Sequence, residues 1–266
     1  MLTIQDILNL KTDLFINSKV KLVRHKDSRA EYKELIKDRE ELLKYQQVQS
    51  KPIFHDCDYI ISFIGQERSK SILFGIFKVN GFSEENGEYN YSLEQLSEFD
   101  YLYNRVIIDW GNNAIAWHQW YKQPKEIIQL LPKGFLGNFL GLLNFVLDFN
   151  ELEQLINNPE SNEDWKNHLS SVNGIYLILD SKTGNQYIGS ANGQNGIWQR
   201  WTDYAKTHHG GNKQLIKLCE EENYYKNFKY SVLQTLPSNI TKKEIDAIER
   251  LYKEKLGTKT FGLNDN

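Results

Sequence analysis

Residues 173–190 read NGIYLILDSKTGNQYIGS, two short apolar runs on either side of a centre rich in turn-forming residues. Runs of this kind, separated by a few Gly, Asn and Ser residues, are typical of an antiparallel β-hairpin. If residues 181–184 form the turn, Asp180 pairs with Asn185, and this pair fixes the register of the hairpin. An ordinary hairpin would need only β-branched residues where this one carries tyrosines beside glycines. Those positions therefore need another explanation.

The predicted register brings two tyrosines together. Tyr176 lies opposite Gly189, and Tyr187 lies diagonally from Tyr176 on the same face. Because glycine has no side chain, Gly189 leaves room opposite Tyr176 for the close approach of a ligand. The hairpin therefore predicts a surface that presents two phenols beside an opening.

The segments after the hairpin alternate between helical and strand-like patterns. We expect helices over 196–209, 212–222 and 241–257 and a strand over 228–236. The last helix begins with a capping box, Thr241 followed by Glu244, and it ends at Gly257. The order β-β-α-α-β-α predicts a small α+β unit.

A carboxylate lies at the edge of the apolar stripe of the last helix. With about 100° per residue, the stripe consists of Ile245, Ile248, Leu251, Tyr252 and Leu256. Glu249 falls beside this stripe, whereas Lys253 points away from it. A carboxylate that faces a core is costly unless it is paired. Glu249 is therefore either half of an internal salt bridge or a functional group, a metal ligand or a general acid/base.

An arginine has a similar position on the helix over 196–209. The stripe of this helix contains Ile197, Trp201, Tyr204 and His208, and Arg200 lies beside it. Arg200 either extends along the apolar surface into water or presents its forked guanidinium to a phosphate. His208, at the end of the helix, is a second candidate to bind a phosphate. Two phenols, an arginine and a carboxylate on one concave surface have the chemistry needed for phosphodiester hydrolysis.

The motifs Gly-Ile-Tyr at 174–176 and Tyr-Ile-Gly at 187–189 resemble the signature of the GIY-YIG nuclease superfamily. Arg200, Glu249 and Asn264 follow in the order that this family uses. The resemblance implies a small three-stranded antiparallel sheet flanked by helices. It also implies an enzyme that cuts DNA phosphodiester bonds with one divalent cation, Mg²⁺ or Mn²⁺, in each active site.

The resemblance implies roles for single residues. Tyr176 is similar to the family's candidate general base, or to a relay that activates the attacking water. Tyr187 resembles the phenol that orients the nucleophile and the scissile phosphate. Arg200 resembles the arginine that stabilises phosphate charge in the transition state, and Glu249 resembles the single protein ligand of the metal. Tyr204 corresponds to a position that is often Tyr or His and that contacts phosphate.

Four further residues complete the predicted site as substrate-binding residues: Gly189, Ser190, His208 and Asn264. Asn264 resembles a late polar residue that supports the site in some members. Ser190 departs from members such as the repair enzyme, which have lysine there. Because serine also occurs at this position in the family, the departure weakens the analogy with repair and not the expected activity.

Length and composition predict two domains in a cytoplasmic protein. The chain has 266 residues, 40% of them hydrophobic, which is enough for two cores. The polar run NNPESNED places an N-terminal domain at 1–156, a linker with a short helix at 157–171 and the nuclease domain at 172–266. Two distant cysteines, no signal-peptide pattern and no membrane-length apolar run indicate a reducing compartment and no membrane partner.

The N-terminal domain is expected to be an α+β module with an antiparallel sheet or a small barrel, because strand-like runs alternate with turn residues. Its aromatic segment, residues 109–121, either stacks on nucleic-acid bases or packs in a small β core. A net charge of −3 permits DNA binding without arguing for it, although residues 19–29 form a local basic cluster.

These observations predict a divalent-metal-dependent DNA endonuclease, of restriction or defence type, whose N-terminal domain selects the target. Two alternatives stay open: a non-catalytic nucleic-acid-binding protein and a structure-selective DNA repair nuclease. Since each chain carries one such site, a double-strand cut needs either a homodimer or two successive nicks.

Overall fold

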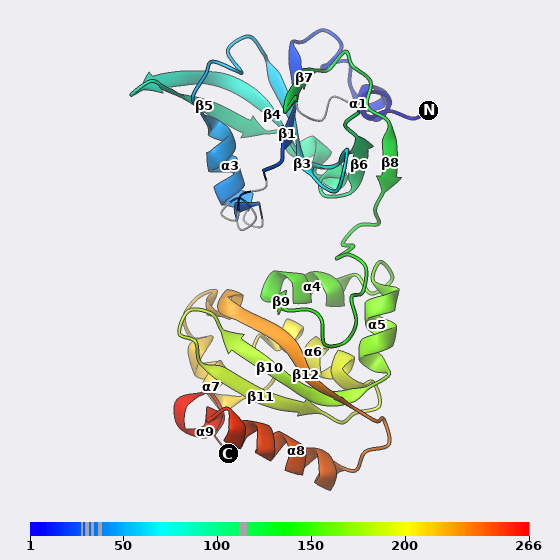
Figure 1. The fold of residues 1–266 in the computed structure, drawn as a ribbon, viewed down its shortest axis with the longest axis vertical. Coiled ribbons are helices and arrows are strands. Elements are labelled where there is room, and N and C mark those ends of the chain that lie inside the picture. Colours follow the sequence, from blue (N-terminus) through cyan, green and yellow to red (C-terminus); the bar gives the residue numbers. More distant parts are fainter. Residues whose placement is uncertain (28, 30–31, 33–34, 37–38, 112–115, 266) are drawn as a thin grey trace. The chain divides into compact units, whose positions relative to one another are not determined.

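The computed structural model describes residues 1–27, 29, 32, 35–36, 39–111 and 116–265. The chain divides into two compact units, Met1–Pro132 and Lys133–Asn266. Each unit contains both helices and strands (Figure 1), which confirms the α+β class expected from the sequence. In the described part of the chain, no helix is both long enough and apolar enough to cross a lipid bilayer.

The N-terminal unit is built on a mainly antiparallel sheet, as predicted. Its described elements are α1 (Ile4–Lys11), β1 (Val20–His25), α3 (Arg39–Gln47), β2 (Val48–Gln49), β3 (Tyr59–Gly65), β4 (Lys70–Glu85), β5 (Glu88–Gln95), a 3₁₀ helix (Ser97–Leu102), β6 (Val106–Asp109), β7 (His118–Trp120) and β8 (Ile127–Leu130). The strand order is β2-β5-β4-β3-β1-β7, and β6 joins β4 to β8. One pair departs from the prediction, because β1 and β3 run parallel.

The basic cluster at 19–29 contributes to the interior of the N-terminal unit. All of β1 is buried. The Lys21 ammonium lies 2.6 Å from an Asp56 carboxylate oxygen, and the Arg24 Nε donates to the Ser71 hydroxyl at 2.8 Å. These two cations of β1 therefore satisfy polar groups inside the unit. Residue 28 of this cluster lies outside the described residues.

The aromatic segment at 109–121 is divided between core and surface. Trp110 is completely buried and Tyr121 is 8% exposed, so both pack in the core. Trp117 and Trp120 are 36% and 43% exposed, respectively. Residues 112–115, which include the start of the strand predicted here, lie outside the described residues. Two of its aromatic rings therefore pack in the core, as one reading predicts, and two remain accessible.

The C-terminal unit has the predicted order of elements with short additions at both ends. It consists of β9 (Leu147–Asp148), α4 (Phe149–Asn157), α5 (Glu163–Ser170), β10 (Asn173–Asp180), β11 (Gln186–Ala191), α6 (Gly196–Thr207), α7 (Lys213–Leu218), a 3₁₀ helix (Tyr224–Asn227), β12 (Phe228–Leu236), α8 (Lys242–Lys255) and α9 (Thr258–Phe261). The sheet order is β11-β10-β12-β9. Three strands were expected, and β9 adds a fourth of two residues.

The boundary between the units lies at Pro132 and not at residue 156. The segment between these positions packs into the C-terminal unit, because β9 pairs with β12 and α4 buries Phe149, Leu152 and Leu155 in the same core as the nuclease motifs. The polar run after α4 marks an exposed connection within this unit. Polarity shows where a chain meets water, whereas a domain boundary also needs few contacts across it.

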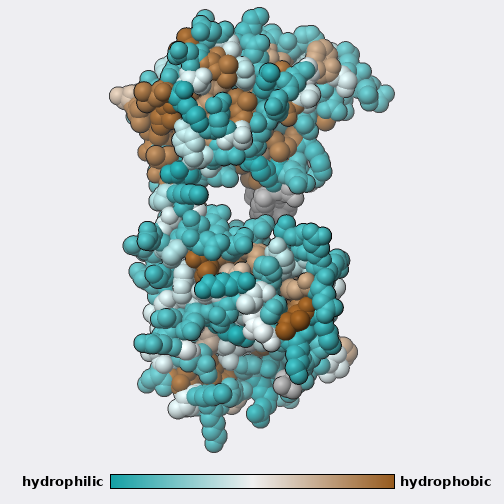
Figure 2. Space-filling view, turned by 180° about the vertical axis from the view of Figure 1, so that it is seen from behind, coloured by the Kyte–Doolittle hydropathy of each residue, from teal (hydrophilic) through white to brown (hydrophobic). Residues whose placement is uncertain are grey.

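Helices cover both faces of the C-terminal sheet. Because successive side chains of a strand point to opposite faces, Tyr176 and Ile178 of β10 pack with α4, α5 and α6 in one cluster. Ile175 of β10 packs with Ile188 and with Ile245 of α8 in another. Hydrophobic residues appear as small patches among hydrophilic ones on the face of this unit seen in Figure 2. The sheet edge at β11 therefore lies between two helices that approach from opposite faces.

Candidate active site

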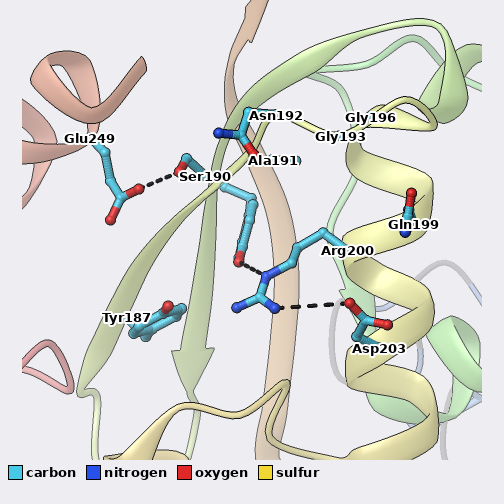
Figure 3. A pocket seen from close by; sticks show the side chains of 11 residues that line it. Tyr187, Ser190, Ala191, Asn192, Gly193, Gly196, Gln199, Arg200, Asp203 and Glu249 are labelled. Atoms are coloured by element: carbon cyan, nitrogen blue, oxygen red, sulfur yellow. Dashed lines mark hydrogen bonds and ion pairs between the residues drawn. The ribbon is translucent and has the colours of Figure 1, made fainter. Parts of the chain in front are cut away.

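A pocket of about 330 Å³ surrounds the edge strand β11. The side chains that line it come from β10, β11, the β11–α6 connection, α6 and α8 (Figure 3). They are Tyr176, Tyr187, Ser190, Ala191, Asn192, Gly193, Gly196, Gln199, Arg200, Asp203 and Glu249. Five of the predicted site residues therefore meet in one pocket: Tyr176, Tyr187, Ser190, Arg200 and Glu249.

The local fold explains this convergence. Gly184 adopts φ +79 in the turn, and the Asp180 N–H donates to the Asn185 carbonyl at 2.9 Å. The predicted register is confirmed, because Tyr176 lies opposite Gly189. Tyr176 and Tyr187 share the α6 face, with ring centroids 6.5 Å apart.

Arg200 and Glu249 approach β11 from opposite faces of the sheet. Arg200 lies in the second turn of α6, and Glu249 lies on α8, whose predicted capping box at Thr241 and end at Gly257 are confirmed. In Figure 3 the carboxylate and the guanidinium lie on either side of the strand that carries Ser190. The predicted single concave surface is in fact a pocket that wraps around a strand edge.

Arg200 and two tyrosines form a hydrogen-bonded network at one wall of the pocket. The Arg200 Nε donates to the Tyr176 hydroxyl at 3.1 Å, and the hydroxyls of Tyr176 and Tyr204 are 3.1 Å apart. Both tyrosines are completely buried. Tyr204 does not line the pocket, so its side chain is placed to act through Tyr176 and not on a phosphate directly, in contrast to the role implied by the resemblance.

Burial keeps both phenols protonated. Desolvation raises the pKa of Tyr176 well above that of free tyrosine, and Tyr187 adds to the rise, while Arg200 and Tyr204 oppose it. Desolvation likewise raises the pKa of Tyr204. The guanidinium alone therefore does not convert Tyr176 into a phenolate at neutral pH. In this geometry Tyr176 is a neutral group that accepts a hydrogen bond from Arg200.

This burial predicts a loss of stability at alkaline pH. The pKa values of Tyr176, Tyr204 and Tyr230 are raised in the folded protein, mainly by desolvation. A raised folded-state pKa stabilises the fold below the unfolded pKa of about 10, and this stability is lost as pH rises above that value. We expect the urea midpoint of the full chain to fall above about pH 10. Tyr204→Phe should reduce this alkaline loss, and a midpoint that does not change between about pH 8 and pH 11 would contradict the prediction.

The space beside Gly189 is filled by the side chain of Tyr176. A Cβ at this position would lie 2.7 Å from Tyr176 Cε2 and closer still to the Cζ and the hydroxyl. Gly174 is similarly restricted, since a Cβ there would lie 2.6 Å from the Gln234 carbonyl oxygen. The predicted opening for a substrate at Gly189 is therefore wrong, because the Tyr176 ring crosses it. The glycine acts on the site indirectly, by setting where that phenol lies.

Both carboxylate oxygens of Glu249 have partners. The Ser190 hydroxyl donates to Oε2, and the Lys253 ammonium lies 2.5 Å from Oε1. The side chains of Glu249 and Lys253 are 17% and 14% exposed, respectively. The sequence left open a salt bridge or a functional group, and the carboxylate combines a salt bridge with a place in the pocket. Lys253 was expected to point away from the apolar stripe of the helix, and its pairing with Glu249 was not predicted.

Two carboxylates line the pocket, Glu249 at the edge of β11 and Asp203 beside Arg200. No cluster of three or more His, Cys, Asp or Glu side chains suited to a metal occurs among the described residues. Mg²⁺ is commonly held by one or two carboxylates together with substrate phosphates and water. Glu249 has oxygen donors of the right chemistry, and the Ser190 hydroxyl orients them. The residues present therefore fit a metal site that the substrate would complete.

Two predicted substrate-binding residues have other contacts. The Asn264 amide donates to the Ile188 carbonyl at 2.8 Å and accepts from the Ile188 N–H at 2.9 Å. Asn264 therefore holds the outer edge of β11, which agrees with a supporting role. His208 follows the last turn of α6, where its ring stacks on Tyr225 at 3.8 Å and packs against Phe149. The structure does not bring His208 into the pocket.

Sequence reasoning missed several residues that line or support the pocket. Asn192 and Gln199 line the pocket. The Asp203 Oδ2 atom lies 3.9 Å from Arg200 Nη1. The i,i+3 spacing of Arg200 and Asp203 and the i,i+4 spacing of Glu249 and Lys253 are the signals that could have indicated both pairs.

The comparisons with known proteins concern about one third of the chain. No protein-family model matches the chain. A curated relative, "Probable intron-encoded endonuclease bI1" from Neurospora crassa, is 30% identical over 100 residues, which are 36% of this chain. The chain spans about a fifth of the length of that relative, 22%.

Two solved structures are also similar. The catalytic domain of the homing endonuclease I-TevI is 26% identical, covers 35% of this chain and 96% of its own, and has a TM-score of 0.28. A glutamate-to-alanine mutant of the same catalytic domain is 25% identical over 36% of this chain and 94% of its own, again with a TM-score of 0.28. The paired motifs on the hairpin and the convergence of Arg200 and Glu249 support a nuclease domain of the GIY-YIG type in the C-terminal unit, and the sequence similarity to an intron-encoded endonuclease agrees with this.

Proposed function

We propose that this protein is a divalent-metal-dependent endonuclease that hydrolyses DNA phosphodiester bonds in its C-terminal unit. One observation supports this most directly: Arg200 and Glu249, from helices on opposite faces of the sheet, line a single pocket with Tyr176 and Tyr187. The sequence similarity to a protein described as an endonuclease points the same way. Folding alone has no need to bring a guanidinium, a carboxylate and two phenols together around one strand edge.

In this mechanism each side chain has a distinct task. Glu249 would hold the divalent cation, which would polarise the phosphate and lower the pKa of a water molecule. Arg200 lies across β11 and stabilises the negative charge that develops on the phosphate, a kind of preorganised stabilisation that often contributes most to catalysis. Tyr187 lines the pocket between them and orients the phosphate.

Tyr176 acts as a neutral hydrogen-bonding group. Its hydroxyl is fixed by Arg200 Nε and by Tyr204, and burial raises its pKa. It is therefore suited to orient the attacking water, and not to remove a proton from it as a preformed phenolate. Tyr204 is a positioning residue, because it contacts Tyr176 and lies outside the lining of the pocket.

We assign target selection to the N-terminal unit. A hollow in this unit is lined by aromatic and polar side chains that include Tyr45 and Trp117, which are 40% and 36% exposed. Exposed aromatic rings beside polar groups are suited to stacking with a nucleic-acid base. Selection of foreign or modified DNA by this unit would give the protein a restriction or defence role. A purely binding role for the chain is disfavoured because the buried network of Arg200, Tyr176 and Tyr204 serves catalysis better than adhesion.

A plasmid-nicking assay tests the proposal. Supercoiled plasmid is incubated with the full chain and Mg²⁺ or Mn²⁺, and in parallel with EDTA. We expect open-circular product only with a divalent cation, and linear product at higher protein concentration if two chains act together. Unmodified plasmid, plasmid with methylated cytosine and branched DNA are compared to separate a defence role from a structure-selective one. Absence of cleavage of all three substrates would overturn the proposed activity.

A further inference from the structure

Lys253 holds the carboxylate that a metal ion would need. Its ammonium lies 2.5 Å from Glu249 Oε1, and both side chains are largely buried. The other oxygen of Glu249 accepts from the Ser190 hydroxyl. Each oxygen of the proposed metal ligand therefore already has a donor, and one of these donors carries a positive charge.

Lys253 also lies where two further hollows meet the edge of the candidate site. One hollow is lined by Asp246, Glu249, Arg250, Lys253 and Lys259. The other is lined by Tyr187, Arg200, Gly211, Asn212, Lys213, Lys253, Asn264 and Asp265. Lys253 is common to both, and each hollow contains at least two other cationic side chains. Cations grouped along a groove are the usual contacts of a DNA backbone.

An ammonium and a divalent cation compete for one carboxylate. Their charges repel at close range, and the repulsion is stronger where the side chains are shielded from water. Lysine has a flexible four-carbon stem and a compact charge, so it can exchange one anionic partner for another. A DNA phosphate next to the scissile bond is the nearest alternative anion when the groove is occupied.

We propose that Lys253 is a phosphate-binding residue that stays paired with Glu249 until a metal ion binds. In the metal-free protein its ammonium neutralises Glu249. Binding of the cation displaces the ammonium, which then contacts a phosphate that flanks the scissile one. This inference rests on the proposed function and assigns Lys253 a place in metal and substrate binding. If the pair only stabilised α8 as an i,i+4 contact, neither metal affinity nor DNA binding would depend on Lys253 in this way.

Titration with Mn²⁺ in the absence of DNA tests the first half. Mn²⁺ is added to the full chain and to Lys253→Met, which removes the charge and keeps most of the stem, with binding followed by calorimetry. We expect the variant to bind Mn²⁺ about tenfold more tightly, because the competing charge is gone. Lys255→Met, a substitution on the same helix outside the two hollows, should leave the affinity unchanged. Unchanged or weaker Mn²⁺ binding by Lys253→Met would overturn the proposal, and Lys253→Gln repeats the test if the methionine variant does not fold.

The salt dependence of DNA binding tests the second half. Duplex DNA is titrated at several salt concentrations, without divalent cation and with Ca²⁺. In Ca²⁺ we expect Lys253→Met to reduce the slope of log K against log salt by about one. Without a divalent cation the slope should not change, because Glu249 retains the ammonium. Equal effects in both conditions would show that no exchange takes place.

The two proposals can fail separately. If the wild-type chain cuts none of the plasmids, the proposed function fails, whereas the Mn²⁺ titration still reports competition at Glu249. If the plasmid is cut and Lys253→Met binds Mn²⁺ no more tightly, only the role of Lys253 fails.

Discussion

Replacement of Glu249 by alanine is expected to lower the rate of plasmid nicking on the order of 10³-fold or more. The substitution removes the carboxylate that lines the pocket on the other side of β11 from Arg200. The cation would then lack its protein ligand. The rate of conversion of supercoiled plasmid at saturating Mg²⁺ is the measurement.

The fold should tolerate this change. Exposed i,i+4 ion pairs contribute about 0.5 kcal/mol or less, and the loss of the partly shielded pair of Glu249 with Lys253 should lower the free energy of unfolding by about 1 kcal/mol. Glu254→Ala, an exposed position on the same helix, is the matched control and should cut at the wild-type rate. Cleavage by Glu249→Ala close to the wild-type rate would show that this pocket is not the active site.

The second large effect is expected from the smallest change, Gly189→Ala. The new methyl group would overlap the ring of Tyr176, which is completely buried. Overpacking of this kind costs about 1–3 kcal/mol. Since the ring must move, the Tyr176 hydroxyl would also leave the Arg200 Nε. We expect both a lower urea midpoint and almost complete loss of nicking.

Gly193→Ala provides the comparison for stability. A Cβ at residue 193 meets its nearest neighbour, the Gln199 side-chain oxygen, at 3.4 Å, an ordinary contact. The urea midpoint of Gly193→Ala should therefore match that of the wild type. If Gly189→Ala were equally stable and active, Gly189 would not determine the position of the phenol.

Local patterns in the sequence were sufficient to predict much of the C-terminal unit. The register of the hairpin followed from its turn, and the start of α8 followed from Thr241 and Glu244. Both depend on contacts within a few residues, which propensity and spacing describe well. The helical wheel also placed Glu249 correctly at the edge of the apolar stripe of its helix.

Features that depend on distant contacts were not predictable in the same way. The wheel assigned Leu251 and Leu256 to the core, yet they are 46% and 45% exposed. The sequence predicted an open space at Gly189, because the position of the Tyr176 ring depends on the packing of β10 and β11. The burial of Tyr204 likewise depends on how α6 packs against the sheet.

The two hydrogen bonds between Asn264 and the backbone of β11 have a consequence for the order in which the site forms. Asn264 is 76 residues from Ile188 in the sequence, and Glu249 is 59 residues from Ser190. The hairpin, in contrast, closes over a few residues and can form early. Contacts between residues far apart in sequence form slowly, because long loops must close before they contribute. During synthesis the two phenols are therefore made long before the carboxylate and Asn264, and we expect a growing chain to acquire its cutting site only in the last step of folding.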